Sequence, residues 1–360
     1  MNRRTLLLGG AAAGVSVAGV AGISIAGMGS RSEYDDWARD LRRPLAPDAG
    51  PREAVRYAGL AANGHNTQPW RFVLEQDRLR ILPDFDRRTP VVDPDDHHLF
   101  VSLGAAAENA SLALRVMGLG GAPIADDAGA ALEIDAGLAE ESALLAAVPQ
   151  RQSSRTLYDG SAIPAEQLRR LQQAAAVPGV RMVLLTDAAR RATLRDMIVA
   201  GNDMQMADPA FMAELKQWLR FNPASAMRRG DGLFTACTGN PSMPGWIGGP
   251  VFDFAFDPGA ESDRYAAQAD SSAGFAVFFG EKADREHWMR VGHACQRFAL
   301  AATAAGLAHA FVNQPVEVPA LCADLAALAG ESVRPDLVIR FGHGPRAPYS
   351  PRRPVSQLLA

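Results

Sequence analysis

The chain of 360 residues carries one helix-and-strand pattern twice, and this internal similarity restricts the possible folds. The segment Pro51-Arg-Glu-Ala-Val-Arg56 matches Pro164-Ala-Glu-Gln-Leu-Arg169 in its proline, glutamate and arginine. A short apolar run follows each segment, at 72–74 in the first copy and at 182–185 in the second. Proline suits the first turn of a helix and glutamate its positive end, so each copy predicts a helix followed by a strand.

A second pair of segments repeats at a fixed distance. Residues 103–119 and 291–307 place apolar side chains on one helical face, and the two faces are 188 positions apart (291 − 103). Each segment ends in Gly-Leu, with Gly118 and Gly306 in place to stop a helix in the left-handed conformation. We therefore expect two equivalent long helices.

The two copies differ in length. Pro51 and Gly104 are 53 residues apart, whereas Pro164 and Gly292 are 128 apart, which gives the second copy 75 extra residues (128 − 53). The extra residues fall at about 195–270, a region with six of the eleven methionines and a Gly/Pro-rich run at 239–250. This insertion is interpreted either as helices followed by an irregular flap over a site or as a packed surface insertion.

The first thirty residues have the composition of a signal segment. Residues 5–29 carry no charge and follow the pair Arg3-Arg4, which is typical of the twin-arginine route for folded proteins. We expect export to the periplasm or cell envelope, with cleavage after Ala26 or, alternatively, an uncleaved membrane anchor. No later stretch has 18 uncharged apolar residues, so we expect the remainder to be soluble.

Charge and cysteine content exclude several classes of protein. Lys plus Arg number 36 against 40 Asp plus Glu, a balance that argues against a nucleic-acid-binding protein. The three cysteines, Cys237, Cys295 and Cys322, form no C-x-x-C pair and are interpreted as core thiols. The run Asp93-Pro-Asp-Asp-His-His98 precedes a predicted helix, where carboxylates cap free N–H groups, so we expect no metal there.

A loop between the first helix and strand is rich in carboxamides. It reads Ala61-Ala-Asn-Gly-His-Asn-Thr-Gln-Pro-Trp70, and such a loop can bring amide donors close to a flat, hydrogen-bonding ligand. A rigid hairpin entry with a buried tryptophan is the structural alternative. His65 could contact a ligand as a neutral donor or could brace the loop. The candidate ligand-binding residues here are Asn63, Gly64, Asn66, Gln68, Pro69 and Trp70.

An arginine motif precedes the helix of the second copy. It reads Arg151-Gln-Ser-Ser-Arg155, and guanidinium groups with a serine hydroxyl suit a phosphate monoester, whose two charges they meet by paired hydrogen bonds. The structural alternative for Arg151 and Arg155 is surface pairing with Asp159 or Glu166. The chain has no Gly-rich phosphate loop of the G-x-G-x-x-G or Walker type.

Together these motifs resemble the FMN-dependent nitroreductase family. The amide loop is similar to A-P-S-x-x-N-x-Q-P-W of that family, departing from it at Ala62-Asn63, and Arg151-x-Ser-x-Arg155 is similar to its R-x-S-x-R motif. The segment Ser350-Pro-Arg-Arg-Pro-Val355 lies where the family places basic residues against the FMN phosphate. With the export signal, the pattern over residues 40–360 is most similar to the duplicated Acg-like branch.

The resemblance implies an α+β, nitroreductase-like fold in which two fused halves form an internal pseudo-dimer. Each half would hold a mixed sheet flanked by helices, and the long helices would pack together at a pseudo-twofold axis. The expected divisions are a signal or anchor at 1–30, a first, truncated half at 31–148 and a second half at 149–360 with the insertion. A strand is expected at Leu337-Val-Ile339.

The resemblance also implies where FMN binds. Copy one has the amide loop but only Leu41-Arg-Arg-Pro-Leu45 in place of the arginine motif, and copy two has the motif but not the loop. One composite site would remain, giving one FMN per chain and a monomer. The expected phosphate ligands are Arg151, Ser153, Arg155, Arg352 and Arg353, with Asn313 and Gln314 near the flavin ring. A wide separation of Asn66 and Arg155 would refute this composite site.

The implied activity is hydride transfer through FMN to a nitro compound or another small acceptor, with NAD(P)H as a candidate donor. No catalytic side chain is required, because FMN N5 does the chemistry. The alternative is an FMN-sequestering protein in which residues 195–270 close over the flavin with little or no turnover. A third interpretation, an exported lipid- or peptide-binding module, predicts a colourless protein.

Overall fold

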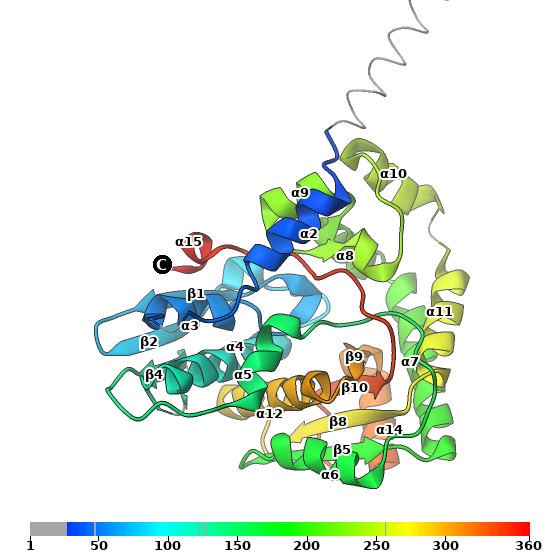
Figure 1. The fold of residues 1–360 in the computed structure, drawn as a ribbon. Helices are drawn as coiled ribbons and strands as arrows, with labels where there is room; N and C mark the ends of the chain where they lie inside the picture. Colours follow the sequence, from blue (N-terminus) through cyan, green and yellow to red (C-terminus); the bar gives the residue numbers. More distant parts are fainter. Residues whose placement is uncertain (1–26, 47, 122, 127, 256) are drawn as a thin grey trace, which may run out of the picture.

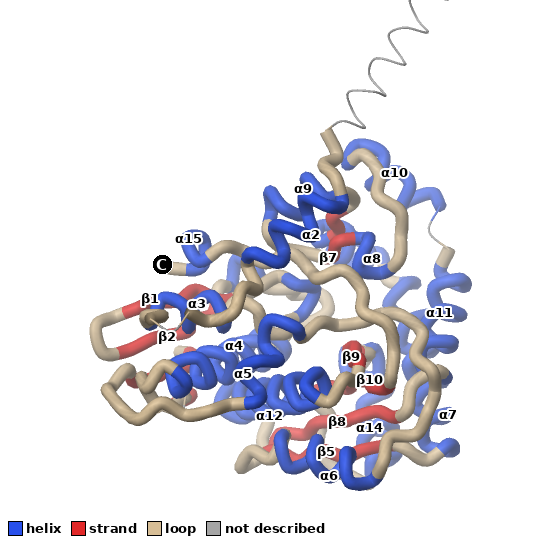
Figure 2. Tube along the Cα trace, in the orientation of Figure 1, coloured by secondary structure: helices blue, strands red, loops and turns tan. Residues whose placement is uncertain are grey.

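A computed structural model of the chain describes residues 27–360 except 47, 122, 127 and 256. The signal peptide, its cleavage site and the anchor expected in residues 1–26 lie outside the described residues. Figures 1 and 2 show two groups of strands on either side of a pair of long helices. The expected α+β class is confirmed.

The first half builds a four-stranded sheet in the order β1-β2-β4-β3. The strands are Trp70–Leu74, Arg78–Pro83, Gly129–Glu133 and Ile124–Asp126, in that order across the sheet. All three pairings are antiparallel. The helices of this part are α2 (Arg31–Asp40), α3 (Pro51–Ala58), α4 (His97–Val116) and α5 (Ala143–Ala147), with short 3-10 turns η1 (Gly64–Asn66), η2 (Phe85–Arg87) and η3 (Val148–Gln150).

The second half repeats this arrangement as β5-β8-β10-β9, again with antiparallel pairings throughout. These strands are Val180–Leu185, Gly274–Gly280, Leu337–Gly342 and Ala308–Phe311. The helices around them are α6 (Ala165–Ala174), α12 (Arg285–Ala304), α13 (Gln314–Glu317) and α14 (Pro319–Ala329). The helix-then-strand prediction and the strand at 337–339 are confirmed in both position and type.

Within the two four-stranded sheets the strands pair only antiparallel, so the expected mixed sheets are not found among these strands. At the edges of these two sheets the parallel contacts are single bridges: Phe72 with Leu359 next to β1, and Ser153 with His309 on β9. The first bridge brings the C-terminal tail, with α15 (Val355–Leu358), from the second half back to the first. The tail therefore ties the two sheets into one body.

The long helices α4 and α12 pack against each other through reciprocal contacts. A Cβ on Gly104 would lie 1.9 Å from the Met289 carbonyl oxygen, and a Cβ on Gly292 would lie 1.9 Å from that of Val101. The two contacts are equivalent, because Gly292 lies 188 positions after Gly104 and Met289 lies 188 positions after Val101 (292 − 104 and 289 − 101). The predicted packing of the two helices is confirmed, and only glycine fits at these close approaches.

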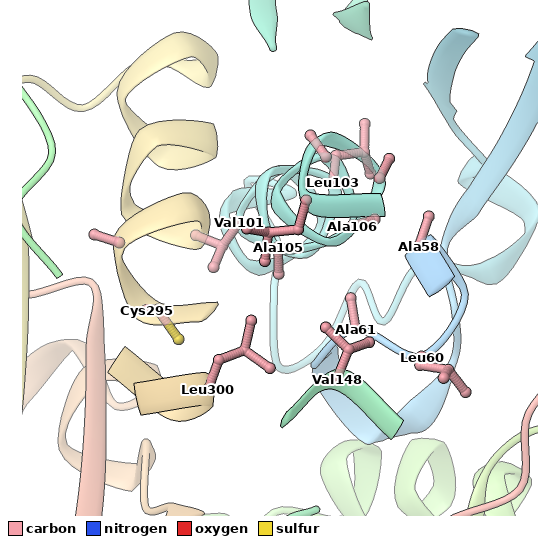
Figure 3. Packing of buried hydrophobic residues seen from close by; sticks show 14 of the residues in the cluster. Ala58, Leu60, Ala61, Val101, Leu103, Ala105, Ala106, Val148, Cys295 and Leu300 are labelled. Atoms are coloured by element: carbon pink, nitrogen blue, oxygen red, sulfur yellow. The ribbon is translucent and has the colours of Figure 1, made fainter. Parts of the chain in front are cut away.

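The same shift of 188 positions relates two polar pairs, each of which joins α4 to α12. Arg297 Nη1 lies 3.1 Å from Glu108 Oε1, and Gln296 Nε2 donates to Asn109 Oδ1 at 2.8 Å. Both helices end as predicted, at Gly118 and Gly306, whose φ values are 70° and 76°. One hydrophobic core spans both halves and contains side chains of both sheets and both helices. Figure 3 shows part of this core, with labelled side chains from α4 and α12.

Between β5 and β8 the chain forms a separate group of elements. They are α7 (Ala188–Ala207), α8 (Pro209–Trp218), β6 (Leu219–Arg220), α9 (Pro223–Arg229), β7 (Leu233–Phe234), η4 (Thr235–Thr238), α10 (Gly245–Ala255) and α11 (Pro258–Asp270). The Gly/Pro-rich run at 239–250 is not wholly irregular, because its last part starts α10 and Pro250 lies inside that helix. We call residues 186–273 the inserted segment.

Among the described residues, α4 is the one helix long and apolar enough to cross a membrane, and 89% of the relevant window is buried within the protein. Its apolar composition is therefore explained by its burial as the central core helix. Cys237 and Cys295 are buried free thiols and Cys322 is half-buried, in agreement with the core-thiol prediction.

Candidate functional site

A cavity of about 770 Å³ lies where the two halves, the inserted segment and the C-terminal tail meet. Asn66 and Arg155, whose separation would have refuted a composite site, both line it. Of the thirteen residues predicted from the sequence, nine line this cavity: Asn63, Gly64, Asn66, Arg151, Ser153, Arg155, Asn313, Gln314 and Arg352. Residues from distant parts of the sequence are thus brought together as predicted.

Three buried arginines line the cavity from three separate segments. Arg151 follows η3, Arg352 comes from the C-terminal tail and Arg42 follows α2, and each is at most 7% exposed. Arg151 and Arg352 both donate from Nη2 to the Leu60 carbonyl, at 3.0 and 3.5 Å, so their guanidinium groups converge. Arg42 donates to the carbonyls of Ala38 and Ser350 at 2.9 and 3.0 Å.

No carboxylate balances this arginine cluster among the described residues. None of the ion pairs found there involves Arg42, Arg151 or Arg352, and Asp159 and Glu166 pair elsewhere. Burial, followed by the charge of Arg42, lowers the pKa of Arg151 to about 10, so Arg151 stays protonated at neutral pH. Burial, then Arg42 and Arg151, also lowers the pKa of Arg352. An uncompensated buried cation cluster favours binding of an anion.

Buried polar atoms around the cavity lack internal partners. Arg151 Nε and Nη1, Arg352 Nε and Gln314 Oε1 make no hydrogen bond within the protein. Because buried donors and acceptors are costly when unpaired, these atoms are suited to a polar ligand. In all, seven of the described lining residues have such atoms: His65, Arg151, Gln152, Asn202, Thr235, Gln314 and Arg352.

The carboxamides of the amide loop are used mainly to hold the loop. Asn63 donates to the Ala61 carbonyl and accepts from the Gln68 N–H at 2.9 Å. Asn66 donates to the carbonyls of Gly232 and Pro351, both at 2.9 Å, and accepts a hydrogen bond from Arg352. The expected amide donors therefore position the loop and Arg352.

Four predicted ligand residues, Gln68, Pro69, Trp70 and Arg353, do not line the cavity. Gln68 is fully buried and donates to the Gly230 carbonyl, while Trp70 is fully buried in the core and Pro69 is buried beside it. Arg353 donates to the carbonyls of Gln68 and Trp70 at 2.7 and 3.0 Å. These residues fasten the tail to the loop instead.

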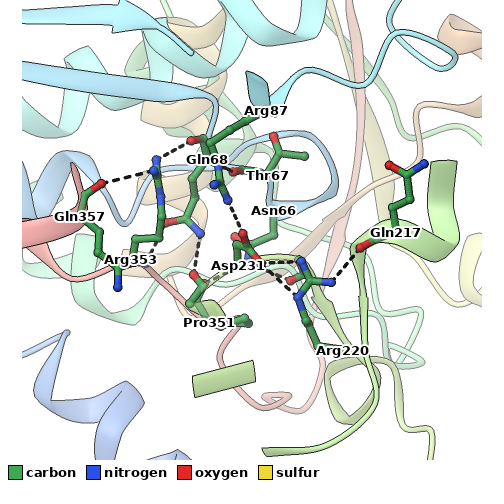
Figure 4. Close-up of polar contacts among 12 residues, drawn as sticks. Asn66, Thr67, Gln68, Arg87, Gln217, Arg220, Asp231, Pro351, Arg353 and Gln357 are labelled. Atoms are coloured by element: carbon green, nitrogen blue, oxygen red, sulfur yellow. Dashed lines mark hydrogen bonds and ion pairs between the residues drawn. The ribbon is translucent and has the colours of Figure 1, made fainter. Parts of the chain in front are cut away.

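Figure 4 shows a second set of contacts that fixes the inserted segment on the amide loop. These contacts involve residues 230–232, between α9 and β7. Gln68 donates to the Gly230 carbonyl, Arg87 pairs with the Asp231 carboxylate, and Asn66 donates to the Gly232 carbonyl. Asp231 also pairs with Arg220, whose Nη2 lies 2.6 Å from Oδ1. This part of the inserted segment is therefore held by buried polar contacts against the first half.

The backbone of the amide loop is in an unusual conformation. His65, Asn66 and Gln68 have φ values of 45°, 54° and 54°, in the left-handed region that non-glycine residues rarely adopt. Burial, then Arg155 and His98, lowers the pKa of His65 to about 4, so the ring is neutral at pH 7. A neutral imidazole at the cavity wall can donate or accept a hydrogen bond.

Sequence reasoning missed several lining residues. The inserted segment supplies Asn202 and Gln205 from α7, Phe211 from α8 and Phe252 from α10, so it forms a mostly apolar wall. The segment Leu41-Arg-Arg-Pro-Leu45 was the one signal for Arg42, but the sequence does not indicate its burial. Asn313 lines the cavity while its Oδ1 accepts from the Val338 N–H at 2.9 Å.

An acid–histidine pair lies on another part of the wall. Glu317 Oε1 lies 3.8 Å from His98 Nδ1, and Gln205 donates to Glu317 Oε2 at 2.7 Å. Burial raises the pKa of Glu317, against the opposing effect of His98. His98 Nε2 lies 3.2 Å from the Asp336 carbonyl oxygen, which can only accept, so Nδ1 is the ring nitrogen that faces Glu317.

The Asp93–His98 run behaves as the predicted helix cap. The Asp93 carboxylate accepts the N–H groups of His98 and Leu99, both at 2.9 Å, at the start of α4. The candidate ligand atoms of Asp93, His97 and His98 lie within 4.8 Å of one another, but the Asp93 oxygens are engaged in these two bonds.

Comparison with known proteins gives two relatives of nearly full length, both from Mycobacterium tuberculosis. The chain is 26% identical over 339 residues to "Putative NAD(P)H nitroreductase Rv3131", covering 87% of this chain and 92% of that protein. It is 23% identical over 325 residues to "Putative NAD(P)H nitroreductase acg", covering 86% and 94%. These likenesses support the nitroreductase family for this chain. No protein-family model matches it.

Solved nitroreductases are similar at a lower level. NfnB of Mycobacterium smegmatis, determined in complex with NADPH, is 14% identical and has a TM-score of 0.40, covering 61% of this chain and 97% of its own. A nitroreductase of Bacteroides fragilis with bound FMN is 16% identical with a TM-score of 0.35, covering 57% and 90%.

Proposed function

We propose that this cavity binds one FMN per chain and that the protein is an FMN-dependent oxidoreductase of the nitroreductase type. The observation that carries the proposal is the cluster of buried arginines on the cavity wall, which makes no ion pair among the described residues and keeps unpaired N–H groups on Arg151 and Arg352. The names of the two mycobacterial relatives support the same activity.

The residues present fit the cofactor at its phosphate end. Arg42, Arg151 and Arg352, with the Ser153 hydroxyl, would hold the phosphate by charge-assisted hydrogen bonds. Asn66 keeps Arg352 in place, and the unpaired Gln314 oxygen and neutral His65 are available to polar edges of a ring. Bound FMN would supply two-electron chemistry, accepting hydride from NAD(P)H and passing it to a nitro compound or another small acceptor.

Glu317 would contribute the proton that such a reduction also consumes. Its carboxyl group lies on the cavity wall, with Oε1 3.8 Å from His98 Nδ1. The raised pKa keeps more of this carboxyl protonated near neutral pH than an exposed glutamate would be.

The chain is proposed to be an internal pseudo-dimer with halves at 31–148 and 149–360. The matched strand orders and the reciprocal contacts of Gly104 and Gly292 support a duplication. The cavity takes its loop from one half and Arg151 from the other, which supports one site per chain and a monomeric protein. We further propose export by the twin-arginine route, with the membrane anchor as the uncleaved alternative, on the sequence of residues 3–29.

A flavin-sequestering protein is the second candidate function. Two observations favour this function. The inserted segment lines one wall of the cavity, and hydrogen bonds from the amide loop to residues 230–232 hold the inserted segment in place. Reduction of the bound flavin by NAD(P)H, followed by reoxidation by a nitroaromatic, supports the enzyme. Reduction by dithionite without any response to NAD(P)H supports sequestration.

The proposal is tested by flavin content and affinity in the arginine variants. Purified protein should be yellow with one FMN per chain, and Arg151→Ala and Arg42→Ala should each weaken FMN binding by about 30- to 1,000-fold, corresponding to about 2–4 kcal/mol. Arg170→Ala is the control, because Arg170 is exposed and pairs with Glu166. Unchanged flavin content in both cavity variants would refute the phosphate site.

A further inference from the structure

Helix α10 presents an apolar stripe to the outside of the protein. Trp246, Pro250 and Phe254 are spaced four residues apart, so they lie on one face of the helix. Trp246 is 64% exposed and Phe254 is 91% exposed, the latter among the most exposed large apolar side chains described. Such a stripe on a protein surface marks a contact with another apolar phase or partner.

The opposite face of α10 is apolar as well. Gly248, Val251 and Phe252 line the cavity, so the helix separates the cavity from the exterior. Asp253 is the one charged residue of this helix, and it is paired with Lys216 at 2.7 Å from Oδ1. A surface helix that is apolar on both faces is suited to a boundary between protein and lipid.

The N-terminal segment leaves the described structure close to this helix. Ala224, on α9, donates its N–H to the Met28 carbonyl at 2.7 Å. Asn222, which caps α9, donates to the carbonyl of Met243 at 3.1 Å, two residues before α10 begins. Figure 1 shows α10 beside the point where the chain emerges. In the sequence, residues 5–29 carry no charge over 25 positions, enough to span a bilayer of about 30 Å.

We propose that α10 is a membrane-contact helix whose stripe of Trp246, Pro250 and Phe254 lies in the headgroup region of a lipid bilayer, beside the N-terminal segment. Tryptophan favours that region because its ring is apolar with a polar N–H group, and phenylalanine adds apolar area to the face of an interfacial helix. A protein partner is disfavoured, since a stable interface buries about 1,200–2,000 Å² and this stripe consists of three side chains. Membrane contact is thereby extended beyond the N-terminal segment.

The proposal is tested by site-specific labelling of the full-length protein in vesicles of phosphatidylethanolamine and phosphatidylglycerol. Phe254→Cys and Trp246→Cys are labelled separately with an environment-sensitive fluorophore and exposed to nitroxide-bearing lipids. Leu138→Cys is a distant control, because Leu138 is 93% exposed in the first half, and Arg228→Cys is a nearby control on the exposed side of α9. The unsubstituted protein corrects for labelling of Cys322.

A blue shift and loss of most fluorescence at positions 254 and 246, with little change at 138 and 228, is the expected result. Equal quenching at 228 and 254 would show mere proximity to the membrane and would overturn the proposal. A blue shift at 254 without lipid would also overturn it, indicating a second copy if it grows with protein concentration and the chain's own N-terminal segment if it does not. The readout needs neither flavin nor turnover, so it fails independently of the proposed enzyme.

Discussion

Arg42 and Arg151 illustrate what single residues reveal before a structure exists. Arg151 was predicted as a phosphate ligand because it stands in a spaced motif with Ser153 and Arg155, and all three residues line the cavity. Arg42 stands in a segment that matches no motif, and its importance comes from burial beside Arg352. Spacing along the chain is readable from sequence, whereas burial and a missing counter-charge require the tertiary structure.

Glu317 carries a prediction about proton supply. Glu317→Gln removes the proton donor, so turnover with a nitro acceptor should fall about 100-fold while FMN affinity stays within a factor of about two. In the parent protein, activity should fall as the pH rises through the raised pKa of Glu317, and the variant should lack this limb. Besides burial, His98 and the Gln205 hydrogen bond lower the pKa of Glu317, and the charges of Asp93 and Glu214 raise it.

Turnover measured over a range of pH gives the readout, and flavin fluorescence gives the affinity. Glu286→Gln is the matched control, because Glu286 pairs with Arg290 on the outer part of α12. Full activity with an unaltered pH profile in Glu317→Gln would exclude the proton-supply role.

His309 carries a prediction about acid stability. Burial, then Arg151, lowers the pKa of His309 to about 3 from an unfolded value near 6.5. Between these values the unfolded chain binds a proton that the folded protein does not, so stability rises with pH and is lost on acidification. From pH 6.5 to 4 the loss attributable to His309 is about 3 kcal/mol.

His309→Gln should therefore lose less stability than the parent between pH 6.5 and 4, as measured by urea unfolding. His343→Gln, at a half-buried position after β10, is the control and should follow the parent. His65, with a pKa of about 4, acts in the same direction in both proteins, so the difference between variants isolates His309. Parallel curves for His309→Gln and the parent would contradict the assignment.

Regular elements followed the sequence more closely than loops did. The helices after Pro51 and Pro164 and the stops at Gly118 and Gly306 were predictable, because they depend on local periodicity and left-handed glycine. The amide loop was located correctly but its chemistry was misjudged, since Gln68 turns into the tail and not into the cavity. Which carbonyl a carboxamide meets depends on residues more than 150 positions away.

The contact between α4 and α12 supplies a prediction at this level. Gly104→Ala should destabilise the protein by about 3 kcal/mol, because the new Cβ would lie 1.9 Å from the Met289 carbonyl oxygen and the helices must separate. Gly292→Ala should cost a similar amount, since it meets Val101 in the same way. Chemical unfolding of both variants is the measurement.

Gly121→Ala is the control for these two substitutions. Nothing lies within 4 Å of the position that its new methyl group would take, so this substitution should leave stability nearly unchanged. Markedly unequal effects at Gly104 and Gly292 would show that the two helices do not contribute equivalently. That outcome would weaken the case for an internal duplication.

On the scale of the entire protein, the C-terminal tail and the inserted segment enclose the cavity, although no sequence motif links the two segments. The tail runs from the second half to a bridge with Phe72 in the first, and the inserted segment rests on the amide loop. The family resemblance placed the tail in the composite site, whereas the sequence left open whether the insertion covers a site or packs on the surface. The contacts of residues 230–232 with the amide loop were not predicted. Such contacts depend on the path of the whole chain.

This arrangement predicts a monomer with a single flavin. Sedimentation equilibrium should give the mass of one chain at micromolar concentration, and absorbance after release should give one FMN per chain. A dimer of two chains with its FMN sites at the interface between the chains would contradict the internal pseudo-dimer. Two FMN per monomer would also contradict it.

The position of Arg352 in the tail has a consequence for biosynthesis. Ribosomes release a chain from its N-terminus onward, so the amide loop and Arg151 are available well before the segment 350–353. The anion site lacks one of its three guanidinium groups until that last segment has left the exit tunnel and reached Leu60 and Asn66. Nascent chains stalled before this point should therefore fail to retain flavin, and the nucleotide should be retained only after residues 350–353 have emerged.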